Sequence, residues 1–124
     1  MAKDMDGKGI GTRLDILVAE PNQPMRAAYQ KLFEAAPLVG KLTVSSNLEE
    51  KGRYDLCFID HIFGNYEWFV DELKQANPRL YVVVTTTFPG NVPQNGFNAV
   101  LHKPFTPDEA YLHVHKALAR KGNL

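Results

Sequence analysis

Four polar residues close or follow short apolar runs of the sequence, and together their side chains could perform phosphoryl chemistry. They are Glu20 after LDILVA, Asp60 after YDLCFI, Thr85 after LYVVV and Lys103 after AVLH. A carboxylate at the end of a strand can accept a phosphoryl group as a nucleophile. A nearby cation and a hydroxyl then stabilise the charge on the oxygens of that group, and a second carboxylate can help to hold Mg²⁺.

The residue types suggest a role for each position. We expect Asp60 to be the acceptor, Lys103 to supply the cation, and Thr85 or its neighbour Thr86 to supply the hydroxyl. Glu20 is then the second carboxylate. A structural alternative stays open at this point, in which Glu20 and Lys103 form only a salt bridge that keeps Asp60 soluble.

Alternating strand-like and helix-like segments predict an α/β domain that would bring these residues together. Strands that alternate with helices imply right-handed crossovers and a parallel sheet with helices on both faces. Sites in such sheets form at the carboxyl ends of the strands. The apolar runs predict strands over residues 14–20, 42–45, 54–60, 80–85 and 99–102. The predicted helices are residues 24–36, a segment capped by Asn65 and ended by Pro78, and a segment that follows the N-cap motif of residues 106–109.

Length and composition limit the domain and its partners. A chain of 124 residues, 44% of them apolar, fits one domain with one core, which we place at residues 14–121 after a flexible tail of residues 1–13. Fourteen acidic and fourteen basic residues give zero net charge, which argues against nucleic acid or an anionic membrane as the main partner. Cys57 is the single cysteine, and no segment predicts a signal peptide or a membrane span, so we expect a cytoplasmic protein.

Four segments in order resemble the response-regulator receiver domains of two-component signalling. The segment ILVAEPN is similar to the family's first strand, and YDLCFID to its third strand, with Asp60 at the phosphoacceptor position. The segment VVVTT is similar to the fourth strand, with Thr85 at the conserved hydroxyl position. GFNAVLHKPFT is similar to the fifth strand and the Lys-Pro turn, with Lys103 as the conserved lysine. The resemblance covers about residues 14–120 and implies a five-stranded, flavodoxin-like doubly wound fold.

The resemblance also implies a function and its partners. A phosphohistidine on a histidine kinase or phosphotransfer protein would be the donor, and an acyl phosphate on Asp60 the product. Mg²⁺ would be the cofactor, held by Glu20, Asp60 and the backbone carbonyl of Ile62. The domain would be a signalling switch rather than a turnover enzyme, and the Lys103–Pro104 peptide bond would often be cis.

Several positions depart from the family's usual pattern. Pro21 replaces the second acid of the usual pair, so the pocket would carry a charge of about −1 and bind Mg²⁺ weakly. Val100 stands where the family has its switch aromatic. The loop after Asp60 lacks the usual Met-Pro pair.

Two connections are poor helix formers, which predicts that the second and fourth helices of the family's fold are shortened or missing. Residues 46–53 are too few for a helix flanked by loops, and residues 86–97 carry two prolines and two glycines. The sheet face beside them would then expose apolar area. We expect a homodimer or a partner surface there, near Phe63, Tyr66, Trp68 and Phe88. The alternative is that Trp68 only covers the part of the sheet that a missing helix would leave open.

Three functions remain open from the sequence. The first is a receiver domain that accepts a phosphoryl group on Asp60 and signals through protein contacts. The second is a pseudo-receiver, an interaction module without regulated phosphorylation, which Pro21 and Val100 favour. The third is a small flavodoxin-like ligand binder or phosphocarrier, which the lack of a glycine-rich loop after the first strand disfavours.

Overall fold

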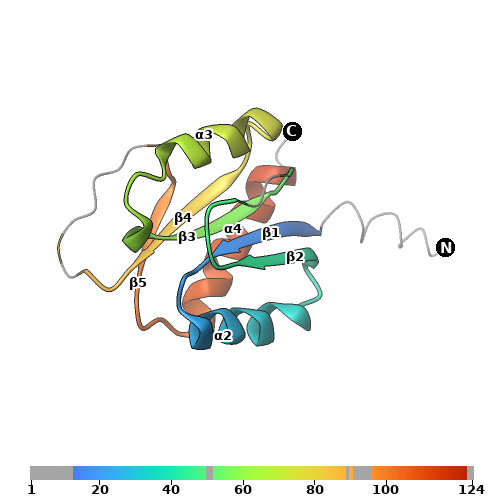
Figure 1. The fold of residues 1–124 in the computed structure, drawn as a ribbon. Helices are drawn as coiled ribbons and strands as arrows, with labels where there is room; N and C mark the ends of the chain where they lie inside the picture. The colour runs from blue at the N-terminus through green and yellow to red at the C-terminus, as the bar shows by residue number, and fades with distance from the viewer. Residues whose placement is uncertain (1–12, 50–51, 89, 91–95, 123–124) are drawn as a thin grey trace.

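The computed structural model describes residues 13–49, 52–88, 90 and 96–122. Within them, the apolar runs form one parallel sheet with the strand order β2-β1-β3-β4-β5 (Figure 1). The order reverses at β1, which pairs with both β2 and β3. This confirms the predicted five-stranded, doubly wound α/β fold. The strands are β1 (Leu14–Ala19), β2 (Val39–Ser45), β3 (Leu56–Asp60), β4 (Tyr81–Thr86) and β5 (Ala99–His102).

Helices cover the two faces of the sheet unequally. Helices α2 (Gln23–Glu34) and α4 (Pro107–Gly122) pack on one face, and α3 (Glu67–Ala76) packs on the other (Figure 1). Because neighbouring side chains of a strand point to opposite faces, β3 and β4 supply apolar side chains to both layers, which explains their unbroken apolar sequences. A short 3₁₀ turn, η1 (His61–Phe63), directly follows β3.

The N-terminal ends of the helices show which of the predicted caps form. The Thr106 hydroxyl accepts a hydrogen bond from the Glu109 backbone N–H at 3.2 Å, and the Glu109 carboxylate accepts one from the Thr106 N–H at 2.8 Å, so the predicted capping box is confirmed. The predicted Asn65 cap is wrong: Tyr66 occupies the N-cap position of α3, with no side-chain capping bond. At α2, Asn22 caps the helix by accepting from the Met25 N–H at 2.9 Å.

The two connections predicted to lose their helices contain none within their described residues. Residues 50–51 of the first connection, and residues 89 and 91–95 of the second, lie outside the described part of the chain. Side chains from loops and strands fill in beside α3: the half-buried residues that pack on that core are Leu48, Phe63, Phe97 and Val100. Of the predicted tail, residues 1–13, only Arg13 is described. No helix in the described part of the chain has the length and apolar character needed to cross a bilayer.

Candidate functional site

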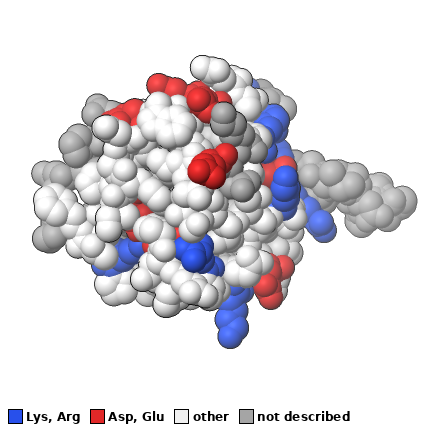
Figure 2. Space-filling model, viewed as in Figure 1, with Lys and Arg blue, Asp and Glu red and all other residues white. Residues whose placement is uncertain are grey.

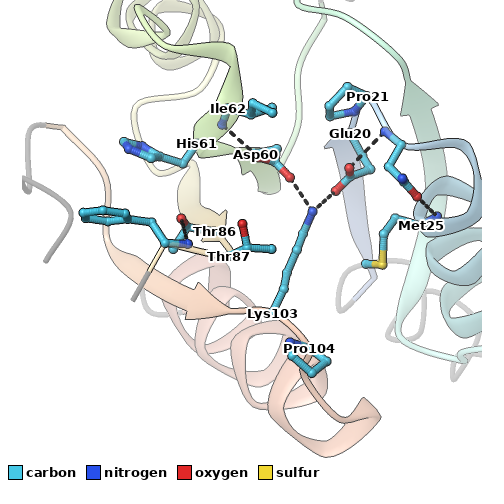
Figure 3. A pocket seen from close by; sticks show the side chains of 12 residues that line it. Glu20, Pro21, Met25, Asp60, His61, Ile62, Thr86, Thr87, Lys103 and Pro104 are labelled. Carbon is cyan, nitrogen blue, oxygen red and sulfur yellow. Dashed lines mark hydrogen bonds and ion pairs between the residues drawn. The ribbon is translucent and has the colours of Figure 1, made fainter. Parts of the chain in front are cut away.

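The candidate site lies at the carboxyl edge of the sheet, where β1, β3, β4 and β5 end. Parallel register aligns these ends, since Ala19 pairs with Ile59 and Asp60 with Thr85. A pocket of about 610 Å³ opens there. Its walls are formed by Glu20, Pro21, Asn22, Met25, Asp60, His61, Ile62, Thr86, Thr87, Phe88, Lys103 and Pro104 (Figure 3).

Lys103 joins the two carboxylates of the pocket. Its Nζ donates to Glu20 Oε1 at 2.6 Å and makes a short ion pair with Asp60 Oδ2, so the ammonium lies between the two acids (Figure 3). The Lys103 backbone N–H donates to the Thr86 carbonyl at 2.8 Å, which ties the end of β5 to β4. The Lys103–Pro104 peptide bond is cis, as the resemblance implied. The structure therefore brings Glu20, Asp60 and Lys103 together.

Backbone groups orient the remaining carboxylate oxygens. The Ile62 N–H donates to Asp60 Oδ1 at 2.8 Å, so the turn η1 fixes the aspartate in place. The Asn22 N–H donates to Glu20 Oε2 at 3.1 Å. Arg26 donates to the carbonyls of Glu20 and Pro21 at 2.9 and 2.8 Å, which secures the turn between β1 and α2. Both acids thus have defined geometry before any ligand binds.

Burial and pairing act in opposite directions on the charged groups. Burial raises the pKa of Glu20, which is only 1% exposed, and the hydrogen bond from Lys103 partly offsets that rise. For Lys103, burial by itself would lower the pKa, but the hydrogen bonds to Asp60 and Glu20 outweigh it and the pKa is raised. Lys103 is therefore a firmly protonated cation at neutral pH.

The threonines differ from the prediction. Thr85 is 1% exposed and is not part of the pocket wall, so the structure does not place it in the pocket with Asp60 and Lys103. The wall instead contains Thr86 and Thr87 (Figure 3). The Thr86 hydroxyl accepts a hydrogen bond from the Phe88 N–H at 2.9 Å and keeps its own proton to donate, so Thr86, the alternative that the sequence offered beside Thr85, and Thr87 are the two hydroxyls of the pocket wall. Sequence reasoning missed Thr87, although the run of three threonines was a visible signal.

Apolar side chains surround the charged floor of the pocket. Ile62 is 76% exposed and Phe88 is 50% exposed, and both lie at the rim. The His61 ring nitrogen Nδ1 and the Tyr66 hydroxyl form a hydrogen bond of 3.1 Å. The His61 ring also lies beside the Phe88 ring. A protein surface that covers this pocket would therefore bury apolar rim and charged floor together.

The donor set suits a hard divalent cation with few protein ligands. The described residues contain no group of three or more His, Cys, Asp and Glu side chains placed to hold a metal, so the pocket offers two carboxylates. Mg²⁺ is commonly bound through one or two carboxylates and several waters, and Glu20 and Asp60 fit that pattern. Lys103 already occupies one oxygen of each acid and would compete with the metal.

The comparisons with known proteins agree on the fold. No protein-family model matches the chain, and no curated protein matches it in sequence. Among solved structures, the signal receiver domain of an HD domain-containing protein from Pseudomonas fluorescens is 16% identical, with a TM-score of 0.72 over 90% of this chain and 99% of that one. A response regulator receiver domain from Methylobacillus flagellatus is 17% identical, with a TM-score of 0.68 over 85% and 98% of the two chains.

A response regulator from Thermotoga maritima is also 17% identical, with a TM-score of 0.66 over 86% of this chain and 98% of its own. These likenesses span most of both chains. The fold of the chain is therefore that of response-regulator receiver domains.

Proposed function

We propose that this chain is a receiver domain of two-component signalling, which accepts a phosphoryl group on Asp60 and signals through protein contacts. The observation that carries the proposal is the ion pair of Lys103 with Asp60 and Glu20 at the carboxyl edge of a receiver-like sheet. A salt bridge that served stability alone would not need an open pocket above it, and this one lies at the floor of a pocket of about 610 Å³.

The reaction would use a phosphohistidine of a histidine kinase or phosphotransfer protein as the donor. An Asp60 carboxylate oxygen attacks phosphorus, the phosphorus–nitrogen bond breaks, and the imidazole leaves with the bonding electrons. The product is an acyl phosphate on Asp60. Lys103 balances charge on the phosphoryl oxygens, and a threonine hydroxyl of the pocket wall, which we assign to Thr86 or Thr87, donates a hydrogen bond to them.

Mg²⁺ is the cofactor that we propose for this transfer, and when bound it would offset charge on the phosphoryl oxygens. Glu20, Asp60 and the backbone carbonyl of Ile62 would hold it. Because Pro21 supplies no carboxylate, the pocket charge from Glu20, Asp60 and Lys103 is about −1. We therefore expect weak binding of Mg²⁺.

A second candidate is a pseudo-receiver, an interaction module without regulated phosphorylation. Val100 supports it, because this residue packs as a half-buried aliphatic side chain on the α3 core and offers no aromatic ring on β5. Pro21 and the two connections without helices in their described residues support it as well. Under either function we propose a cytoplasmic protein whose partners are proteins, with neither nucleic acid nor membrane as the target.

Beryllofluoride, which mimics an aspartyl phosphate, separates the two candidates. With millimolar Mg²⁺ and beryllofluoride, we expect backbone NMR shifts at Asp60, Ile62 and Thr87. Asp60→Asn should abolish the shifts, and Asp71→Asn, which changes an exposed acid on α3, should keep them. If the wild-type spectrum stays unchanged across the titration, the phosphoacceptor function fails and the pseudo-receiver remains.

A further inference from the structure

Another pocket lies at the amino edge of the sheet, opposite the candidate site. The strands β1, β3 and β4 begin at this edge, and the end of α4 lies beside them (Figure 1), where Lys121 Nζ donates to the Arg13 carbonyl at 2.7 Å. The pocket has a volume of about 390 Å³ and is lined by Arg53, Asp55, Asn77, Arg79 and Lys121. The proposed phosphoryl chemistry uses none of these residues, so the pocket calls for its own explanation.

Asp55 is the buried acid of this pocket, and it holds basic side chains beside it. Asp55 is 3% exposed, and its Oδ2 accepts from the Asp15 N–H at 2.9 Å and from Lys121 Nζ at 3.2 Å. A guanidinium nitrogen of Arg53 is 3.7 Å from Asp55 Oδ1. Groups of the chain therefore satisfy this carboxylate, and two cations are fixed at the pocket wall by their contacts with it.

Positive charge exceeds negative charge in the pocket wall. Among the described residues that line it, Arg53, Arg79 and Lys121 are three cations against the one carboxylate of Asp55, which makes a formal charge of +2. A fourth cation lies next to the wall, since Arg120 Nε donates to the Arg79 carbonyl at 2.8 Å. Cations held this close repel one another, and a cleft lined by one sign of charge concentrates ions of the other sign. The wall is thus suited to an anion.

The types of donor in the wall favour a phosphate group. A guanidinium presents a planar fork of N–H donors that matches phosphate oxygens, and an ammonium adds a compact charge. The side chains of Arg53 and Lys121 are 63% and 31% exposed, so both can donate to a ligand that enters from solvent. A phosphate group carries up to two negative charges at neutral pH and so balances the excess charge of the wall.

We propose that this pocket binds a small phosphorylated molecule, with its phosphate or diphosphate group held by Arg53 and Lys121. The buried Asp55 carboxylate is a positioning group in this site, because it holds the two cations and does not itself contact the ligand. The inference is independent of the proposed function, since the pocket lies at the opposite edge of the sheet from Asp60.

Inorganic pyrophosphate is the probe that tests this site, in a backbone NMR titration of the full chain at constant ionic strength without Mg²⁺. We expect saturable shifts at Arg53, Asp55 and Lys121. Arg53→Gln should weaken binding roughly five- to tenfold, because one charge-assisted contact is lost, and Arg53→Glu should abolish it. Lys41→Glu is the matched control: Lys41 is an exposed cation of β2 outside the pocket wall, and its variant should bind within about twofold of wild type.

Two results would overturn the inference. Shifts that never saturate, or that are equal in wild type and Arg53→Glu, would mean general screening of surface charge. Shifts centred on Asp60 and Lys103 would place the anion in the candidate site instead. Asp60→Asn should bind pyrophosphate as wild type does, so failure of this site leaves the phosphoacceptor function standing, and failure of beryllofluoride binding leaves this site standing.

Discussion

At the scale of single residues, Lys103 decides the electrostatics of the site. One ammonium pairs with two nearly buried carboxylates, Glu20 and Asp60, which would otherwise repel each other, and the three groups together carry a charge of about −1. Removing a partner from a buried ion pair is strongly destabilising when it leaves charge uncompensated. The three positions should therefore respond very differently to neutral substitutions.

Lys103→Met should lower the free energy of unfolding by about 3 kcal/mol, because two buried carboxylates then lack a cation. Asp60→Asn should change it by less than about 1 kcal/mol, since a balanced Lys103–Glu20 pair remains. Urea denaturation of the two variants measures both effects. Mg²⁺ should then stabilise Lys103→Met more than wild type, because the metal replaces the missing cation without competition. Equal stabilisation of both proteins by Mg²⁺ would contradict competition between lysine and metal.

Single residues also show which parts of the site could not be predicted from the sequence. Glu20, Asp60 and Lys103 could be predicted because each ends or follows an apolar run, and parallel register brings such ends together. Thr85 is buried and lies outside the pocket wall, whereas Thr86 and Thr87 belong to it. The sequence could not choose among three successive threonines, because the register of β4 and the path of the chain after it decide which hydroxyl reaches the pocket.

At the scale of elements, the strands and helices of the structure lie close to the ranges that the hydrophobic pattern predicts. The strand boundaries differ most at β2, which begins at Val39 rather than at residue 42. This edge strand is mostly half-buried or exposed, so its apolar signal is weak. Among the residues that the structure describes, His113 Nδ1 on helix α4 is buried without a hydrogen-bond partner, and its ring lies beside that of Tyr81 on β4.

His113 should make the packing of α4 on the sheet sensitive to pH. Burial lowers the pKa of His113, and the charge of Lys116 lowers it further. The unfolded chain therefore binds the proton more tightly than the native state, so stability should fall as pH decreases from about 6.5 through the lowered native pKa. His113→Phe should lose less stability than wild type over that range in urea denaturation at stepped pH. His115→Gln, an exposed position on the same helix, should follow wild type. Parallel curves for wild type and His113→Phe would contradict this account.

At the scale of the whole molecule, the two sheet faces are covered by different amounts of helix. Helix α3 alone packs on its face within the described part of the chain, and Trp68 on α3 and Phe88 beside the pocket are each 50% exposed. Of the other predicted interface aromatics, Tyr66 is buried and Phe63 is half-buried against the core on the α3 side. The surface seen in Figure 2 is mostly uncharged, with acidic and basic side chains scattered over it. We propose that a second copy of the chain covers exposed apolar side chains on the α3 face.

Trp68→Ser tests the dimer. We expect wild type to sediment as a dimer at high concentration, and Trp68→Ser to shift toward monomer because the interface loses an aromatic anchor. Leu112→Ser is the matched control, since Leu112 is 52% exposed but lies on α4, on the opposite face. A wild-type monomer at every concentration in analytical ultracentrifugation would contradict the dimer.

The central claim is that Asp60 accepts a phosphoryl group, and intact-mass spectrometry after incubation with acetyl phosphate and Mg²⁺ tests it most directly. The account predicts that wild type gains the mass of one phosphoryl group, that hydroxylamine removes it as expected for an acyl phosphate, and that Asp60→Asn gains none. A wild-type mass that stays unchanged, or a gain that persists in Asp60→Asn, would contradict the account.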